Sequence, residues 1–225
     1  MLHTTRTLLT AALLCLASAC GKSAGGQPNN PNDTGTVGET RSAKALEGSV
    51  KGFIVNAESG AFMQVDVSGG MGGVVQPATL LILSETPDAC ADLTSNAVAA
   101  NSDMLALVLY NVDATMNLLP ASGGTYAAPT PTGNTVPAGM YSDGGLSHFG
   151  AECEPAWSDE SDEGLVTGGQ VLLETIDAST ATGTVDLTFK DDHLKGAFRA
   201  TPCPKFAAMM MGTGGPVPAA TCRKK

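Results

Sequence analysis

The chain has 225 residues, with 22 acidic against 12 basic side chains, a formal net charge of −10, 27 glycines and 13 prolines. This acidic balance excludes nucleic-acid binding as the main function and disfavours direct adsorption to an anionic lipid surface. The abundance of turn-forming residues and the scarcity of charge favour a β-rich protein.

The first twenty residues form a processing signal. Arg6 supplies a short basic start, and Leu8–Leu16 is an apolar run of signal-peptide length. This run is too short to span a bilayer, which takes about 20 apolar residues. Three small residues, at 17–19, then precede Cys20. The pattern predicts a signal peptide over residues 1–19.

The run that ends at Cys20 and Gly21 resembles the lipobox of bacterial lipoproteins. The resemblance implies that the thiol of Cys20 receives a diacylglyceryl group, that cleavage precedes this residue, and that the new amine is acylated. Two or more acyl (palmitate-type) chains anchor a protein stably, whereas one binds reversibly. Glycine after the cysteine implies the outer membrane of a Gram-negative bacterium. The alternative is an ordinary secretory signal cleaved near Ala19.

Composition divides the remaining chain into three parts. Residues 20–44 hold the lipidated cysteine and a Gly-, Pro- and Asn-rich linker, which contains almost no apolar residues and reaches roughly 25–30 Å as a flexible coil. Residues 45–205 are long enough for one domain with a full core. A Met-, Gly- and Pro-rich tail covers 206–225, and we expect Cys222 to clip it back onto the domain.

The first half of the domain contains four expected strands and one helical turn. Pro87–Leu93 predicts a helical turn with Asp88 as its cap. Two of the strands are apolar on both faces, which is typical of strands buried in the middle of a fold, although the second also suits a short core helix. The strands are Ser49–Asn56, Phe62–Val67, Thr79–Leu83 and Met104–Tyr110.

The second half predicts an antiparallel meander. Thr184–Lys190 and Leu194–Ala200 alternate apolar and polar residues on either side of a polar turn at 191–193, and Gln170–Ile176 supplies a third strand. Strict alternation indicates one buried face and one solvated face. Seven or more strands without a long amphipathic helix predict an all-β fold, an antiparallel β-sandwich stabilised by disulfides; an open β-barrel is the alternative.

Cysteine positions support an oxidising compartment. The chain has six cysteines; Cys15 leaves with the signal, and lipidation of Cys20 leaves an even number in the domain and tail. Those four are disulfide candidates: Cys90, Cys153, Cys203 and Cys222. Of the three possible pairings we favour Cys153 with Cys203 and Cys90 with Cys222. The absence of a CxxC motif disfavours a zinc site.

No catalytic motif stands out, so no catalytic residue is assigned. Ser147 and His148 are adjacent, but their surroundings lack the G-x-S-x-G spacing of a nucleophile elbow. His193 lies in the predicted hairpin turn and is expected to be solvated. The three methionines Met209–Met211 suggest a copper site, because thioethers bind Cu(I). No histidine lies nearby in the sequence, so we favour packing as the role of these side chains. No cofactor is expected.

An acidic stretch offers a weak calcium candidate. Carboxylate oxygens are the ligands that Ca²⁺ prefers, but the stretch lacks the spacing of an EF-hand, so we favour a solvated loop. Trp157 within it is the only tryptophan, either a surface contact or a lid over the core. The carboxylates are Glu152, Glu154, Asp159, Glu160, Asp162 and Glu163.

These observations predict a lipid-anchored protein of the cell envelope. Its expected role is that of a non-enzymatic binding or structural module, whose loops over Tyr126–His148 meet a protein or glycan partner. The alternatives are a secreted hydrolase, which would need Ser147, His148 and a carboxylate in one pocket, and a calcium-stabilised envelope module. The body resembles the small disulfide-bearing β-sandwich domains that such bacteria tether to their envelopes.

Overall fold

The computed structural model describes residues 46–50, 53–55, 57–68, 75–131, 136–156, 164–211 and 218–224. The predicted signal peptide, Cys20 and the linker lie outside these residues, as do Trp157 and the carboxylates at 159, 160, 162 and 163. The described helices include none that is long and apolar enough to cross a membrane.

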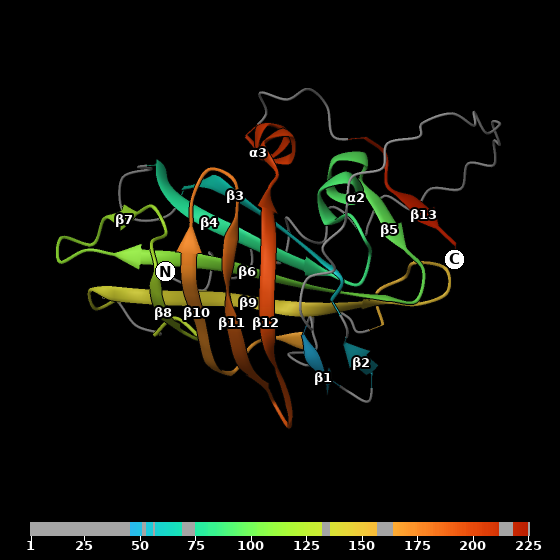
Figure 1. Cartoon of the computed structure of the whole chain (residues 1–225), viewed down its shortest axis with the longest axis horizontal. Coiled ribbons are helices and arrows are strands. Elements are labelled where there is room, and N and C mark those ends of the chain that lie inside the picture. The colour runs from blue at the N-terminus through green and yellow to red at the C-terminus, as the bar shows by residue number, and fades with distance from the viewer. Residues whose placement is uncertain are drawn as a thin grey trace.

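The described part of the chain is mostly strand, with two short helices (Figure 1). The helices are α2 (Ala89–Ser95) and α3 (Pro204–Met210). The strands are β1 (Glu47–Val50), β2 (Phe53–Val55), β3 (Ser59–Ser68), β4 (Val75–Ser84), β5 (Ala97–Ala99), β6 (Ser102–Val112), β7 (Leu118–Leu119), β8 (Gly124–Ala127), β9 (Gly139–Phe149), β10 (Gly168–Ile176), β11 (Ala181–Phe189), β12 (Asp192–Pro202) and β13 (Thr221–Arg223). The all-β class is therefore confirmed.

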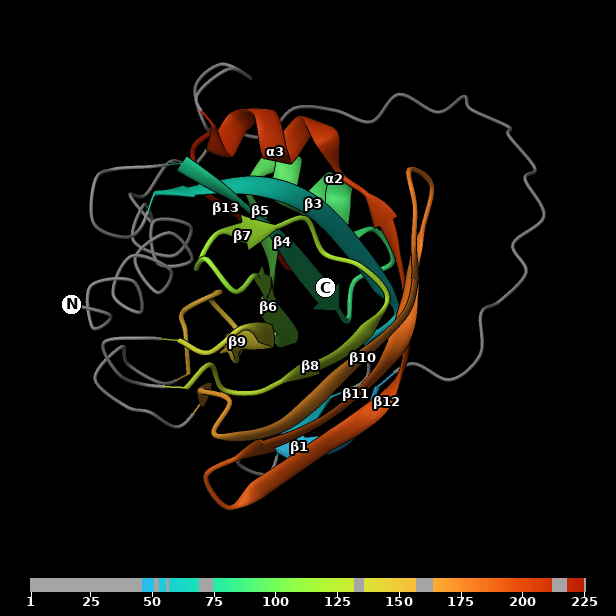
Figure 2. The ribbon, with the colours of Figure 1, turned by 90° about the vertical axis from the view of Figure 1, so that its left-hand side faces the viewer.

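The antiparallel sandwich was the wrong prediction, because the main sheet closes on itself as a mixed eight-stranded barrel (Figure 2). The ring runs β3-β4-β6-β9-β8-β10-β11-β12 and returns from β12 to β3. Two parallel contacts complete it: β12 meets β3 at Thr201–Ala61 and Pro202–Phe62, and β8 meets β9 at Ala127–Tyr141. A closed ring leaves no exposed edge between these strands.

The predicted meander is confirmed as β10, β11 and β12. Their buried residues alternate with exposed ones. The buried side chains point into the barrel and form its core together with side chains from the other strands. Tyr126 of β8 is fully buried there, and its hydroxyl donates to the Ser122 carbonyl at 2.8 Å. Burial raises the pKa of Tyr126, so the phenol stays protonated and keeps this donor.

The two runs that are apolar on both faces are strands β4 and β6, as predicted, and the structure shows what covers each face. Leu81 and Leu107 point into the barrel, whereas Ile82 and Val108 point outward. Helices α2 and α3 lie on this outer face (Figure 2) and bury Leu93 and other apolar side chains against it. Strands β4 and β6 therefore lie between the barrel core on one face and the two helices on the other.

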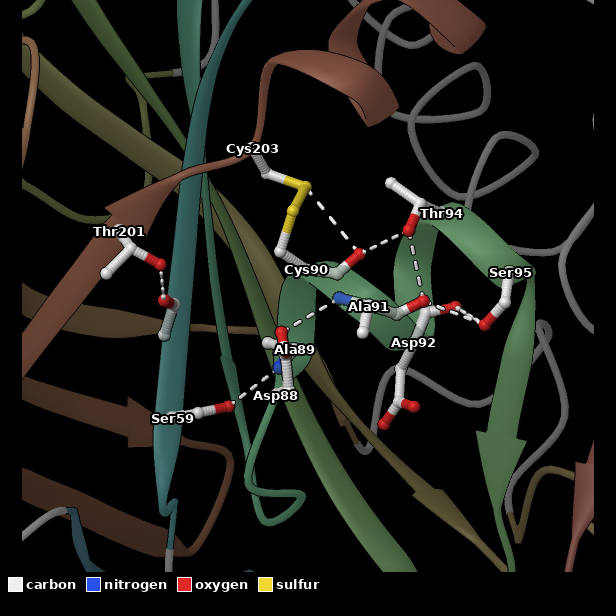
Figure 3. The surroundings of a disulfide bond; sticks show 11 residues. Ser59, Asp88, Ala89, Cys90, Ala91, Asp92, Thr94, Ser95, Thr201 and Cys203 are labelled. Atoms are coloured by element: carbon white, nitrogen blue, oxygen red, sulfur yellow. Dashed lines mark hydrogen bonds between the residues drawn. A yellow bond between two sulfur atoms is a disulfide. The ribbon is translucent and has the colours of Figure 1, made fainter. Parts of the chain in front are cut away.

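Helix α2 begins where the sequence predicts it. The Asp88 carboxylate accepts a hydrogen bond from the backbone N–H of Ala91 at 2.9 Å, which satisfies one of the free donors of the first turn (Figure 3). Ser59 of β3 accepts from the Ala89 N–H at 2.9 Å and ties the helix start to the barrel. Asn96 ends the helix in the left-handed conformation, with φ 51°.

The expected recognition loop over Tyr126–His148 includes the end of β8 and nearly all of β9, and its described residues between these strands are 128–131 and 136–138. Gly144 of β9 serves strand packing. A Cβ atom on Gly144 would lie 2.0 Å from the Ala106 carbonyl oxygen of neighbouring β6, so only glycine allows this approach.

Candidate functional site

His148, to which the sequence assigns no catalytic role, forms a largely buried pair with a residue that the sequence did not single out. His148 of β9 faces Asp103 of β6 across the strand pair, and its Nδ1 lies 2.8 Å from Asp103 Oδ1. The side chains are only 13% and 3% exposed. Asp103 lies two residues before Leu105 on β6, so both side chains point to the same face of the strand, which is the barrel interior. Asp103 therefore lies at one end of that interior.

A third ionisable side chain continues this row. Glu85 follows β4 directly, and its carboxylate accepts a hydrogen bond from the Asp103 N–H at 3.1 Å. The Glu85 N–H in turn donates to the Asp103 carbonyl at 3.2 Å, which fixes the two residues side by side. Glu85, Asp103 and His148 therefore form a polar row from the end of β4 across β6 to β9. Such a row terminates an apolar barrel core with groups that bind one another.

The structure does not bring Ser147 and His148 into one site. Successive residues of a strand point to opposite faces. Ser147 pairs with Met104, whose side chain packs against the outer apolar layer, whereas His148 pairs with inward-facing Asp103. A Ser147–His148 nucleophile–base contact would therefore require a break in the extended conformation of β9 between the two residues.

The two histidines that the sequence singled out allow a matched prediction. His193 also contacts an aspartate across a strand pair, Asp186, but these side chains are 51% and 56% exposed. We expect His148→Ala to lower the free energy of unfolding by about 1.5–3 kcal/mol, because it removes a hydrogen bond to a buried carboxylate. His193→Ala should change it by about 0.5 kcal/mol or less. Urea unfolding of both variants at pH 7 measures the difference; equal losses would contradict the burial of Asp103.

The described members of the acidic stretch are engaged with protein groups. Glu152 forms an ion pair with Lys224 at 2.7 Å, and Glu154 accepts a hydrogen bond from the Glu152 N–H at 2.8 Å. Among the described residues, no group of three or more His, Cys, Asp or Glu side chains is placed to hold a metal ion. Met209 is buried, while Met210 and Met211 are exposed.

All four candidate cysteines are in disulfides, but the favoured pairing is wrong. Cys90 bonds to Cys203, and Cys153 bonds to Cys222. Helices α2 and α3 pack together on one barrel wall, which brings Cys90 to the start of α3 (Figure 3). Strand β13 pairs with β5, which brings Cys222 to the loop after β9. Both juxtapositions are long-range and have no local sequence signal.

One small cavity lies between α2, β5 and the outer face of the barrel. Its volume is about 40 Å³, and Asn96 and Asp92 contribute polar groups to its lining. The Asn96 Nδ2 group donates to the Pro218 carbonyl at 2.9 Å, and Oδ1 is a buried acceptor with no hydrogen-bond partner among the described residues. The space suits one or a few water-sized molecules.

Comparisons with protein-family models, with curated proteins and with solved structures find no match to this chain.

Proposed function

We propose that this chain is a membrane-anchored lipoprotein of the cell envelope, held at the outer membrane of a Gram-negative bacterium. The observation that carries the proposal is the cysteine pairing. The four cysteines beyond the lipobox bond to one another in two disulfides, so none of them is left to pair with Cys20. Acylation of Cys20 then accounts for the one remaining thiol of the mature chain, and stable disulfides suit an oxidising compartment.

We further propose that the folded body is a non-enzymatic binding or structural module. Its barrel interior is filled with apolar side chains, including Phe189, Leu187 and Leu194, each 0% exposed. The cavity of about 40 Å³ is far below the roughly 300–1,000 Å³ of small-molecule sites. The filled barrel interior favours recognition of a protein or glycan on the outer surface over chemistry inside the barrel.

The anchor is tested with a Cys20→Ser variant. Because acyl chains provide the membrane affinity, we expect the wild-type protein to sediment with membranes and to enter the detergent-rich phase on Triton X-114 partition. The variant should lose at least about 90% of its membrane-bound fraction, since no second anchor is expected. A Cys15→Ser variant, altered in the same signal but outside the acylation site, is the control and should stay membrane-bound. Membrane retention of Cys20→Ser would contradict the proposal.

The alternatives have weaker support. A hydrolase using Ser147 and His148 meets the difficulty that these side chains point to opposite faces of β9. A calcium-stabilised module would rely on a stretch whose described carboxylates, Glu152 and Glu154, already accept protein donors. A rise in the melting temperature with millimolar Ca²⁺, absent with Mg²⁺, would revive the calcium alternative.

A further inference from the structure

The C-terminal segment Pro218–Lys224 lies against α2 and β5 through polar contacts. Strand β13 runs parallel to β5, the Arg223 carbonyl accepts from the Ala100 N–H at 2.9 Å, and Thr221 N–H donates to the Asn96 carbonyl at 3.0 Å. The Arg223 guanidinium contacts the Asp92 carboxylate at 2.8 Å. These contacts hold the segment in one register on the body.

No residue of Pro218–Lys224 is buried, and in this it differs from helix α3, which the other disulfide joins to the body. Helix α3 buries Phe206 and Ala207 in the outer apolar layer, so we expect packing to hold it in place even without Cys90–Cys203. The segment Pro218–Lys224 has no such packing. Its contacts are backbone hydrogen bonds, one bond from Asn96, and an ion pair whose Arg223 side chain is 51% exposed, and such contacts contribute little by themselves. The Cys153–Cys222 bond is therefore the contact that makes its attachment permanent.

The same segment covers one wall of the small cavity. Asp92, Asn96 and the three residues of β5 line the cavity, and each of them also contacts or pairs with the segment. Strand β5 has β13 as its partner in a separate two-stranded sheet outside the barrel. Detachment of the segment would expose the backbone edge of β5 to solvent. Asp92 and Asn96 would lose their contacts with Arg223 and Pro218.

We propose that Pro218–Lys224 is a redox latch over the cavity between α2 and β5, locked by Cys153–Cys222. Opening requires a dithiol reductant. One of its thiolates attacks a sulfur of the disulfide, and its second thiol resolves the mixed disulfide. Cys153 and Cys222 thereby gain two electrons and two protons and become thiols, while the dithiol becomes a disulfide. The barrel and the α2–α3 pair remain folded, since their apolar contacts do not involve the latch.

Hydrogen exchange with mass spectrometry tests the latch. In a Cys153→Ser/Cys222→Ser variant, peptides covering β5 with Ala100 and the segment 218–225 should exchange about tenfold faster or more, because their amides open locally. Peptides from β6 and β9 should change less than about twofold. Wild-type protein under mild dithiol reduction, with loss of Cys153–Cys222 verified by mass, should show the same pattern.

Arg223→Ala with both disulfides intact is the control for the polar contacts. We expect its β5 exchange to stay within about twofold of wild type, because the covalent bond still holds the segment in place. Unchanged exchange at β5 in the serine double variant would overturn the proposal, since polar contacts alone would then hold the segment. Parallel acceleration throughout the barrel, or failure of that variant to fold, would also overturn it, because the bond would then support the whole domain.

Discussion

Replacing Leu173 by alanine is expected to lower the free energy of unfolding by about 2–5 kcal/mol. Leu173 of β10 is 1% exposed and belongs to the barrel core, so its truncation removes buried apolar surface and leaves a cavity. Urea denaturation, followed by tryptophan fluorescence and far-ultraviolet circular dichroism, measures the loss as a lower midpoint with an unchanged slope.

The neighbouring residue provides a matched control for this prediction. Leu172 is the same residue type on the same strand, but it points outward and is 37% exposed. Leu172→Ala should cost about 0.5 kcal/mol or less, because surface substitutions away from special features have small effects. A larger loss for Leu172→Ala than for Leu173→Ala would mean that β10 is turned the other way and that the barrel interior is assigned to the wrong face.

Removing the Cys90–Cys203 bond with a Cys90→Ser/Cys203→Ser variant should cost about 4 kcal/mol. The bond joins residues 113 positions apart, so it strongly restricts the unfolded chain, while the folded helices stay packed either way. The Cys153–Cys222 bond closes a shorter separation of 69 residues and restrains a segment that the fold does not bury. Its removal should cost less, because the folded state also gains freedom when the segment is released.

Chemical denaturation of the two double-serine variants checks this order. The reduced wild-type protein, with all four cysteines as thiols, should lose about as much stability as the two variants together if the bonds act independently. A greater loss from the Cys153–Cys222 pair would show that the C-terminal segment supports the barrel. It would therefore also argue against the latch.

Local patterns predict local elements of this fold well. Alternation over residues 184–190 and 194–200 identifies two strands of the barrel, because a half-buried strand repeats every two residues. Asp88 before an apolar turn identifies the start of α2. Helix α3 was missed in the tail, although Pro204 at its first position and the Ala and Met residues that follow are favourable for a helix.

The wrong predictions, the sandwich fold and the cysteine pairing, concern contacts between residues far apart in the sequence. A sandwich and a barrel share the same alternation, and what separates them here is two short parallel contacts, one of which pairs β3 with β12 about 140 residues later in the chain. Apolar chains on both faces of β4 correctly indicate a buried strand, but they do not reveal that helices cover the outer face. The Cys90–Cys203 bond follows from that packing and the Cys153–Cys222 bond from the pairing of β13 with β5, so spacing arguments could predict neither.

The sequence draws attention to His148 of the polar row but not to Asp103 or Glu85. In the sequence, His148 stands beside Ser147, but its partner Asp103 lies 45 positions earlier on β6, and Glu85, which contacts Asp103, follows β4. Had β6 and β9 been paired in advance, the period of two along each strand would have placed Asp103 and His148 on the same face. The missing information was the strand order.

The measurement that tests the central claim most directly is the intact mass of the non-reduced protein isolated from its native membrane fraction. We predict the mass of residues 20–225 plus the acyl groups on Cys20, less four hydrogens for the two disulfides. An unmodified chain that starts near Cys20 would contradict the lipid anchor. It would instead indicate a secreted protein with an unpaired thiol.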